Sequence, residues 1–567
     1  MASLLSPGVI TREIDLTTVT PAVASTEGGI ALHTQWGPAG KLVLITDELD
    51  LVEVFGKPKS SYNAENWFTA KNFLSYSGAL YVSRALNTDA LNSVSNGDSV
   101  LVKNLDHWES GGQPTSANFI AKYPGTIGDS LKVELADSSV FAAWAYKSLF
   151  GDAPTQDQLH VVIIDEDGLF SGEKGKVLEK FEFLSKLSDG KYEDGSSSYY
   201  QKILNDSSEY IWAKEHLLPE WGKTESETVV YDANGEITSL IEADNVIMMG
   251  AGSISTGHSL GTDAGTQGHN GTSDDQNRVN AMSLFADDEL VDISFLLAGK
   301  ADSLVISEIF AIASSRQDCL GVISPEKDDV VNAINPMTNV KTFRESLSVG
   351  GLRDLKGSFM VMDDNWKYQF DKYNNLNRWV PCNGDTAGLM AETDIERAAW
   401  FSPGGRSLKN VIKLAWKSKK AERDVLYPLG VNSVTTFPGE GAILYGDRTM
   451  LKRPSAFDRI NVRRLFIVLR KTISRTARAF LFEQNTEFTR ERFKNTVIPF
   501  LEEVQGRQGI TDFLVVCDET NNTGQVIDQN RFIGDIYIKP ARSINFIELN
   551  FVAVRTDVEF SEVVGSV

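Results

Sequence analysis

The sequence predicts a multidomain protein of the α/β and α+β classes, with a discontinuous α/β core domain, an inserted, mainly β outer domain and a C-terminal α+β domain. The chain has 567 residues, which is too long for a single hydrophobic core. In the stretches 21–88 and 292–435, short apolar strands alternate with amphipathic helices. The intervening region, 89–291, is polar and rich in loops, and the last part, 436–567, combines two long helices with alternating strands.

The first 20 residues predict a strand without a local partner. Ile10, Ile14 and Leu16 alternate with polar residues, which is the period of a strand. No hairpin partner follows nearby, and a lone strand is not stable in water. We therefore expect this arm, residues 1–20, to pair with a distant strand of the same chain or of another chain.

The two core stretches predict one domain that is interrupted in sequence. In the first, strands at 42–47 and 79–86 flank helices that end at Gly56 and Gly78. In the second, strands and helices alternate, and we expect them at 293–299 (strand), 303–316 (helix), 318–325 (strand), 330–347 (helical) and 357–363 (strand). The matching textures predict that both stretches belong to the same core.

The region 89–291 predicts a separate domain. Strand patterns flank the Pro124-Gly125 turn, another strand is expected at 159–167, and Asn234-Gly235 predicts a hairpin within 229–240. Residues 172–187 (GEKGKVLEKFEFLSKL) favour an amphipathic helix. The Gly- and Ser-rich stretch 250–275 predicts a mobile loop.

The stretch Pro454–Asn485 predicts a long helix with one apolar and one cationic face. Ser455 and Asp458 fit a capping box at its start. At about 100° per residue, the apolar face gathers Val462, Leu465, Phe466, Leu469, Ile473 and Phe480. The opposite arc, called the basic strip from here on, consists of Arg459, Arg463, Arg464, Arg470, Lys471, Arg475 and Arg478. Such a strip is either a solvated helix face or a docking surface for an anionic partner.

Downstream of this helix, the pattern within 488–509 predicts a second helix, with Gly506 and Gly509 past its end. Strands are expected at 513–519, 531–540 and 543–554. The last two strands and the N-terminal arm are candidates to share one sheet.

Charge is distributed unevenly along the chain. The net charge is −22, but the part from Phe437 onward carries 18 basic and 17 acidic residues, so the rest has a net charge of −23. Between Arg448 and Arg478 there are ten basic residues and one acidic residue. Direct binding of nucleic acid is not expected, because the total field would repel it.

Several functional classes are disfavoured by the sequence. The three cysteines are far apart, which fits a reducing compartment and argues against a thiolate metal site. No run of about 18 apolar residues predicts insertion into a membrane. The acidic pairs Asp287-Asp288, Asp328-Asp329 and Asp363-Asp364 are expected at helix ends or loops.

The motif Gly257-His258-Ser259-Leu260-Gly261 matches G-x-S-x-G, the nucleophile elbow of serine hydrolases. That mechanism needs a helix directly after the serine and a histidine from a separate element. The following residues do not predict a helix, and His269 lies in the same loop. Catalysis by Ser259 is therefore a remote alternative. We expect no catalytic residue, no metal site and no cofactor.

The sequence also resembles a known family. Residues 457–466 (FDRINVRRLF) and 482–485 (FEQN) are similar to the C-terminal domain of the tail sheath proteins of contractile-tailed phages, particularly T-even-like phages. Residues 4–15, 35–58 and 367–394 resemble the N-terminal arm and the core of that family. Region 89–291 resembles it only at 123–129 and looks shorter than in the T-even-type sheath.

The resemblance implies a structural subunit rather than an enzyme. Family members polymerise as a helical sleeve around a tail tube in a metastable extended state, then contract and drive the tube through the host envelope for genome ejection. It implies that the partners are other copies of the chain, the tail tube protein, and the baseplate and tail terminator proteins. The expected location is the virion tail, after assembly in the host cytoplasm. An alternative is the sheath of a phage-like contractile injection particle or secretion system.

The resemblance also assigns roles to the ends of the chain and to the C-terminal domain. Arms at 1–20 and at the C-terminus add strands to a sheet in a neighbouring subunit, and 436–567 faces the tube. The arm residues are then Val9, Ile10, Ile14, Leu16, Ile544, Phe546, Ile547, Leu549 and Phe551. The basic strip is expected to contact the tube or another sheath subunit.

Overall fold

The computed structural model describes 25–59, 64–87, 89–98, 100–155, 157–218, 221–224, 229–231, 237–240, 257–260, 275–347 and 355–545. These residues fall into two compact units. One comprises the described residues of 22–399 together with 403–463. The other, called the C-terminal unit below, comprises 400–402 and the described residues from 464 onward. The predicted N-terminal strand lies outside the described residues.

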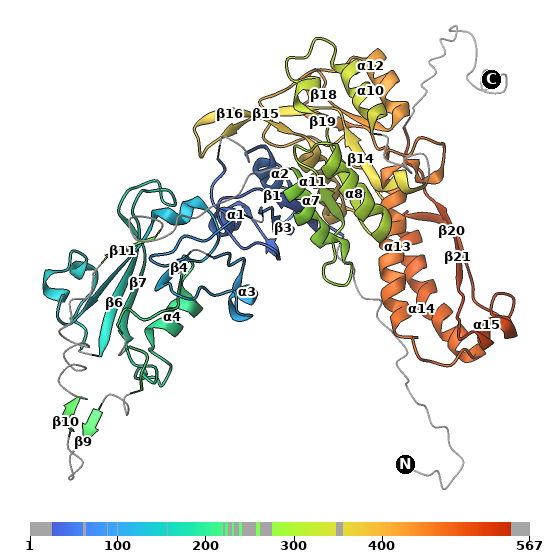
Figure 1. The fold of residues 1–567 in the computed structure, drawn as a ribbon. Helices are drawn as coiled ribbons and strands as arrows, with labels where there is room; N and C mark the ends of the chain where they lie inside the picture. The colour runs from blue at the N-terminus through green and yellow to red at the C-terminus, as the bar shows by residue number, and fades with distance from the viewer. Residues whose placement is uncertain are drawn as a thin grey trace, which may run out of the picture. The chain divides into compact units, whose positions relative to one another are not determined.

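An eight-stranded sheet is the centre of the first unit (Figure 1). Its strand order is β19-β18-β14-β13-β12-β1-β3-β2. The strands are β1 (Gly28–Leu32), β2 (Leu42–Ile45), β3 (Leu80–Arg84), β12 (Phe295–Leu297), β13 (Leu320–Ile323), β14 (Met360–Asp363), β18 (Val431–Thr436) and β19 (Ala442–Tyr445). The strands run parallel except for β2 and β19 at the two edges. Because β1 pairs with β12, this sheet joins strands that are more than 200 positions apart in the sequence.

Two glycines show that both faces of β1 are covered. A Cβ at Gly28 would lie 2.8 Å from the ring of Phe73, in helix α2 (Ala64–Leu74). A Cβ at Gly29 would lie 2.7 Å from the ring of Phe285, in the 3-10 helix η4 (Ser283–Ala286). Successive residues of a strand point to opposite faces. Aromatic rings therefore pack against β1 from both sides of the sheet and leave no room for a side chain at Gly28 or Gly29.

The other helices of this unit are α1 (Glu48–Phe55), α7 (Asp275–Met282), α8 (Ser303–Arg316), α9 (Lys327–Val330), α10 (Pro336–Ser346), α11 (Asn383–Glu396) and α12 (Lys420–Leu426). Helix α8 has the bounds that the pattern predicts, and Gly56 ends α1 with φ +77°. Helices α2 and α11 pack against each other, as do α7 and α8.

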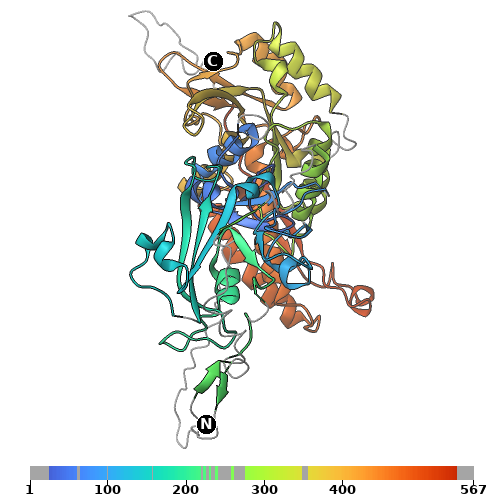
Figure 2. The same ribbon diagram turned by 60° about the vertical axis from the view of Figure 1, so that its left-hand side comes forward.

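A second sheet forms between β3 and β12 in the sequence. It is antiparallel with the order β11-β5-β6-β7 (Figure 2). Its strands are β5 (Leu131–Asp137), β6 (Gln158–Asp165), β7 (Lys176–Ser185) and β11 (Gly257–Ser259). Smaller pairs are β4 (Phe119–Ala121) with β8 (Ile211–Ala213), and the predicted hairpin β9 (Val229–Tyr231) with β10 (Ile237–Leu240). Two short helices, α3 (Leu105–Glu109) and α4 (Tyr200–Ser207), accompany them.

The helix predicted at 172–187 is wrong, because Lys176–Ser185 within this range form the edge strand β7. Phe181 and Phe183 alternate with Lys180 and Glu182, which is a strand period within a segment whose lysines and glutamates also favour a helix. The neighbouring strand β6 is almost entirely buried, and pairing with β7 satisfies the backbone hydrogen-bonding groups along its second edge. Tertiary pairing therefore decides the conformation.

A three-stranded sheet follows directly after β14. It has the order β16-β15-β17, with β15 (Trp366–Asp371), β16 (Leu376–Pro381) and β17 (Lys413–Leu414). The C-terminal unit contains most of α13 (Ile460–Arg478), then α14 (Glu487–Gly506), β20 (Ile510–Val516), α15 (Gly524–Asp528) and β21 (Asp535–Pro540). Strands β20 and β21 pair as an antiparallel ribbon, and β20 packs against α14.

Candidate interaction site

Helix α13 begins later than its sequence predicts. Ser455 caps the short 3-10 helix η7 (Ala456–Asp458), accepting a hydrogen bond from the Phe457 amide at 3.3 Å. Arg459 is extended, and the amide of Ile460 donates to the carbonyl of Asp447. The predicted capping box is therefore wrong, and α13 starts at Ile460 after this extended residue.

The apolar face of α13 is buried near the start of the helix and opens toward its end. Val462, Leu465 and Leu469 are almost completely buried. Phe466, Ile473 and Phe480 are half-buried. Burial of this face therefore varies along the helix axis, which an amphipathic pattern alone does not predict.

The basic strip is not one exposed surface. Arg463, Arg464 and Lys471 are 8%, 3% and 7% exposed, and Arg459 and Arg475 are half-buried. Only Arg470 and Arg478, of the seven, have exposed side chains. The expectation of a continuous cationic face is corrected to a shorter exposed segment in the second half of α13.

Contacts within the chain explain why the first half of the strip is covered. The guanidinium of Arg463 lies 4.2 Å from the ring centre of Phe359 and 4.0 Å from that of Phe457. Such cation–π contacts stabilise a buried arginine. Arg459 donates to the Tyr427 hydroxyl at 2.6 Å and forms a 2.8 Å ion pair with Asp447. These cations therefore hold the fold together.

Exposed apolar side chains lie in the turn after α13, at Leu481 and Phe482, and in the first helical turn of α14, at Phe488. Leu481, Phe482 and Phe488 have most of their side chains exposed, and Phe482 is fully exposed with φ +68°. A left-handed φ is unusual for a bulky residue and carries strain. Exposure of these three side chains was not predicted, although a leucine and two phenylalanines outside any apolar periodicity are a usable signal.

The ribbon β20–β21 has open edges within the described residues, because each strand pairs there only with the other. Its outer face carries the exposed cross-strand pair Leu514 and Tyr537 and the ion pair Asp512–Lys539 at 2.7 Å. Of the nine predicted arm residues, only Ile544 is described, and it is exposed and irregular. The other eight lie outside the described part of the chain.

Ser259 is not at a nucleophile elbow. It lies in strand β11, opposite Lys132 of β5, and its hydroxyl donates to Glu166 at 2.6 Å. Lys132 in turn lies 3.0 Å from Glu134 and 3.8 Å from Glu166. The mechanism requires the serine in a tight turn between a strand and a helix, with a histidine base. The hydroxyl instead forms part of a polar cluster beside an edge strand, and 257–260 is not a loop as predicted.

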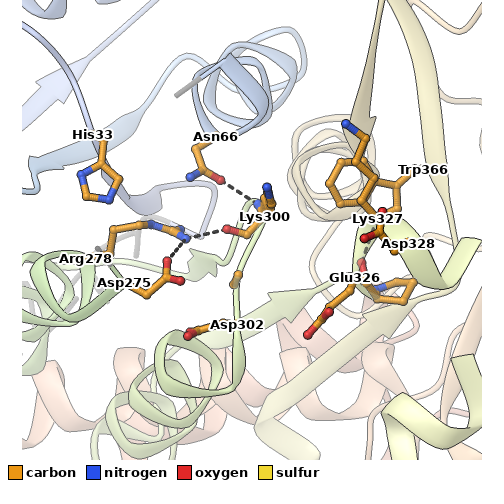
Figure 3. Close-up of a pocket in the computed structure, with 12 residues that line it drawn as sticks. His33, Asn66, Asp275, Arg278, Lys300, Asp302, Glu326, Lys327, Asp328 and Trp366 are labelled. Atoms are coloured by element: carbon orange, nitrogen blue, oxygen red, sulfur yellow. Dashed lines mark hydrogen bonds and ion pairs between the residues drawn. The ribbon is translucent and has the colours of Figure 1, made fainter. Parts of the chain in front are cut away.

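A polar cavity of about 330 Å³ opens at the carboxyl ends of β1, β12 and β13 (Figure 3). In it, Arg278 donates to the carbonyls of Lys300 and Ala298, both at 2.5 Å, and lies 3.6 Å from Asp275. Asn66 accepts a hydrogen bond from the Lys300 amide at 2.7 Å.

The acidic groups of this cavity are explained by helix starts. Helices α2, α7, α8 and α9 all begin there, and Asp302 caps α8 by accepting hydrogen bonds from Leu304 and Val305. Carboxylates stabilise helix N-termini. Burial and the nearby Asp302 raise the pKa of Asp275. Asp302 is therefore a helix cap, Asp275 and Asp328 lie in first helical turns, and the lining does not define a cofactor site. Among the described residues, no three His, Cys, Asp or Glu side chains gather as metal ligands.

The pair Asp363-Asp364, expected at a helix end or in a loop, is buried at the end of β14. Asp363 accepts a hydrogen bond from Ser324 at 2.9 Å, and Asp364 accepts one from the Val434 amide at 2.8 Å. Burial raises the pKa of Asp363 well above its usual range and that of Asp364 to about 7. These groups join β14 to β13 and β18.

No described helix combines the length and apolar character needed to span a bilayer.

Three domain families match the chain. They are the N-terminal region of domain III of the tail sheath protein Gp18 at 29–85, the phage tail sheath protein central domain at 291–450 and the phage tail sheath C-terminal domain at 452–553. The tail sheath protein of Vibrio phage KVP40 is 32% identical over 99% of the chain and 100% of its own length. The tail sheath protein of Enterobacteria phage T4 is 32% identical over 99% of both chains. The alignment with the KVP40 protein spans 674 positions, which is more than the 567 residues of this chain, so this chain is aligned with gaps.

Solved structures show the same fold. The sheath tail protein Lin1278 of Listeria innocua superposes with a TM-score of 0.54, at 12% identity, over 93% of this chain and 94% of its own. The sheath tail protein DSY3957 of Desulfitobacterium hafniense gives 0.53 at 13% identity, over 94% and 100%. The contracted helical sheath of the anti-feeding prophage gives 0.50 at 14% identity, over 97% and 99%.

Proposed function

The chain belongs to the family of phage tail sheath proteins and is a structural subunit of a contractile tail, and we propose that its copies form a helical sleeve around the tail tube. The observation that carries this proposal is identity of 32% to the T4 tail sheath protein along nearly the whole chain. The sleeve is assembled in an extended, metastable state and contracts to drive the tube through the host envelope. Stability of the extended state is then kinetic, because a barrier separates it from the contracted state.

In this proposal the copies are linked by exchanged strands. The arm at 1–20 and the C-terminal arm, which includes 544–551, add to the edges of the β20–β21 ribbon of neighbouring copies. Open strand edges are templates for pairing, and backbone hydrogen bonds give the affinity. Such a link tolerates rotation of whole subunits while other contacts are exchanged.

The domains have different roles in the sleeve. Residues 21–88 and 292–435 form the core, 89–291 is an inserted outer domain, and 436–567 is the inner domain. The inner domain faces the tube through the exposed segment of the basic strip, Arg470 and Arg478, with half-buried Arg475 beside them. The baseplate and the tail terminator are the partners at the two ends of the sleeve. Assembly takes place in the host cytoplasm, and the finished sleeve is part of the virion.

Electron microscopy of the purified protein, with and without tail tubes, tests this function. Hollow striated sleeves that surround the tubes are expected. Sleeves that also form without tubes would show that polymerisation is intrinsic to the chain. Globular particles that remain monodisperse with tubes, at every protein concentration, would contradict the proposal.

A further inference from the structure

The sheet β16-β15-β17 has one buried face and one partly exposed face. Lys367, Gln369 and Asp371 of β15 are buried, and Gln369 accepts a hydrogen bond from Asn72 of α2 at 3.0 Å. The intervening residues, Tyr368 and Phe370, lie on the opposite face. This second face is buried at Trp366, whose indole donates to the carbonyl of Pro325 at 2.8 Å, and it opens at half-buried Tyr368 and exposed Phe370. The open part is called the aromatic face below.

The aromatic face combines rings with a cation. Tyr368 pairs across the strands with Trp379 and Lys413, and the two rings lie 4.7 Å apart. The Lys413 ammonium is 5.0 Å from the Tyr368 ring and 5.4 Å from the Trp379 ring. Phe370 beside them is 54% exposed. Such a face matches a partner that offers carboxylates together with an apolar side chain.

The chain itself contains a segment with this chemistry. The turn Asp287–Leu290, called the acidic turn below, has three consecutive carboxylates, all exposed, followed by a leucine that is 67% exposed. No cation in the described ranges forms an ion pair with these three carboxylates. The backbone of the turn is fixed, because Arg316 donates to the carbonyls of Phe285, Asp287 and Val291 at 2.7 to 3.0 Å.

Topology places the two features at opposite edges of the parallel sheet. The acidic turn precedes β12 and therefore lies at the amino edge. Strand β15 begins two residues after β14 ends, so the aromatic face lies at the carboxyl edge. The two features cannot meet within one molecule. They meet when a second copy follows the first along the strand direction, and such a head-to-tail contact propagates into an open polymer.

We propose that the aromatic face of one copy binds the acidic turn of the next copy. The proposal is carried by the charge complementarity of the two features. The aromatic face is cationic, and because each copy has a net charge of −22, another copy offers it an acidic partner. It rests on the proposed polymerisation, but it is separate from the exchange of arm strands.

Another acidic segment with an exposed leucine is a poorer match. Helix α1 presents Leu49, but Asp47 there caps the helix, Asp50 accepts from Thr46, and Glu48 pairs with Lys372 at 3.4 Å. Those carboxylates are already used within the chain. In the acidic turn, Asp287 accepts hydrogen bonds from the amides of Glu289 and Leu290, and Asp288 interacts electrostatically with Arg316. Neither Asp288 nor Glu289 forms a close ion pair with a cation of the described residues.

A charge-swap cycle tests the contact. The variants are Lys413→Glu, the double variant Asp288→Lys/Glu289→Lys, and their combination, each in the full chain, with the polymerisation threshold measured by sedimentation. Either reversal is expected to raise that threshold about tenfold, because like charges then face each other across the contact. The combination is expected to restore it to within about threefold of the unmodified chain.

The control is Lys176→Glu, the same charge change at an exposed position of β7. Combined with Asp288→Lys/Glu289→Lys, it should not restore the polymerisation threshold. If the unmodified chain polymerises but the reversals have no effect, or if their combination does not rescue, this inference is wrong and the sleeve proposal stands. If the unmodified chain forms no polymer even on tail tubes, both are wrong. Circular dichroism of the unassembled variants verifies that each one folds.

Discussion

Arg470 and Arg478 are the exposed cations of α13, and the proposed tube contact depends on them. Replacing both with glutamate should weaken binding of the sleeve to purified tubes about tenfold, because attraction becomes repulsion at the contact. Co-sedimentation of subunits with tubes measures this. Lys452→Glu/Arg453→Glu, which reverses two exposed cations before α13, is the matched control and should bind normally. Equal loss in both variants would mean that net charge, and not the strip, controls binding.

Gly29 is held between its neighbours so tightly that any side chain must displace Phe285. We expect Gly29→Ala to lower the free energy of unfolding by about 1–3 kcal/mol, the usual range for overpacking. Urea denaturation of the unassembled chain measures this. Gly151→Ala is the control, since a Cβ there has no atom within 4 Å. An unchanged urea midpoint for Gly29→Ala would show that β1 can shift without lowering the free energy of unfolding.

The raised pKa of Asp364 predicts that the free energy of unfolding decreases as the pH rises. Its pKa in the fold, about 7, lies above the ordinary value of 3.8, so the folded chain holds a proton that the unfolded chain has released. The stability from this group is complete below about pH 4 and declines as the pH rises toward 7. Unfolding by urea should therefore need less denaturant at pH 7.5 than at pH 5.

The matched variant is Asp364→Asn, which cannot ionise and should flatten this dependence. Burial likewise raises the pKa of the neighbouring Asp363, so part of the slope should persist. Asp194→Asn is the control, because the Asp194 side chain is exposed and hydrogen bonds from Ser196 lower its pKa. An identical slope in Asp364→Asn and the unmodified chain would exclude this group as the cause.

At the scale of elements, the arms carry the proposed linkage. Deleting residues 2–16 should abolish long sleeves and leave the thermal unfolding of the subunit unchanged, because the described core does not include them. Electron microscopy and calorimetry measure the two effects. Sleeves of normal length from the deleted chain would reject strand exchange by the N-terminal arm.

The elements that the sequence predicts well are those whose local pattern and tertiary environment agree. Helix α8 has an aspartate cap and a continuous apolar stripe, and it was predicted with its observed bounds. Strand β7 was predicted as a helix, because its lysines and glutamates favour a helix while the edge of β6 requires a strand. The three-stranded sheet was missed, since its strands are short and one lies more than 30 positions after the others.

The candidate site likewise depends on tertiary contacts that a local sequence pattern does not reveal. A helical projection finds the arginines of α13, but it cannot show that Phe359, about 100 positions earlier, covers Arg463. It also cannot show that Tyr427 and Asp447 bind Arg459. Burial of a cation by distant aromatic rings is a tertiary property. The sequence therefore identifies the helix, and the fold selects which of its charges face outward.

At the scale of the whole molecule, charge opposes assembly. Each copy has a net charge of −22, and copies repel one another over distances comparable to the Debye length, about 10 Å at 0.1 M salt. Raising sodium chloride from 20 to 200 mM should lower the protein concentration needed for polymerisation. The repulsion involves all charges of both copies, whereas attraction is limited to a few pairs, so screening favours assembly on balance.

Tube binding through Arg470 and Arg478 should respond to salt in the opposite direction, because screening weakens attraction between unlike charges. Light scattering without tubes and co-sedimentation with tubes separate the two responses. A polymerisation threshold that rises with salt would mean that specific ion pairs, rather than net repulsion, dominate the contacts between copies.

The pairing of β1 with β12 also governs how the protein is made. When the ribosome has synthesised β3, strand β1 has one of its two neighbours, and β12 begins only at Phe295. At about 5–20 residues per second, the residues between β3 and β12 take roughly 10–40 s to translate. During that time the nascent chain carries an apolar strand with an open edge. Early folding of the intervening domain, or a chaperone, would shield that edge until β12 is made.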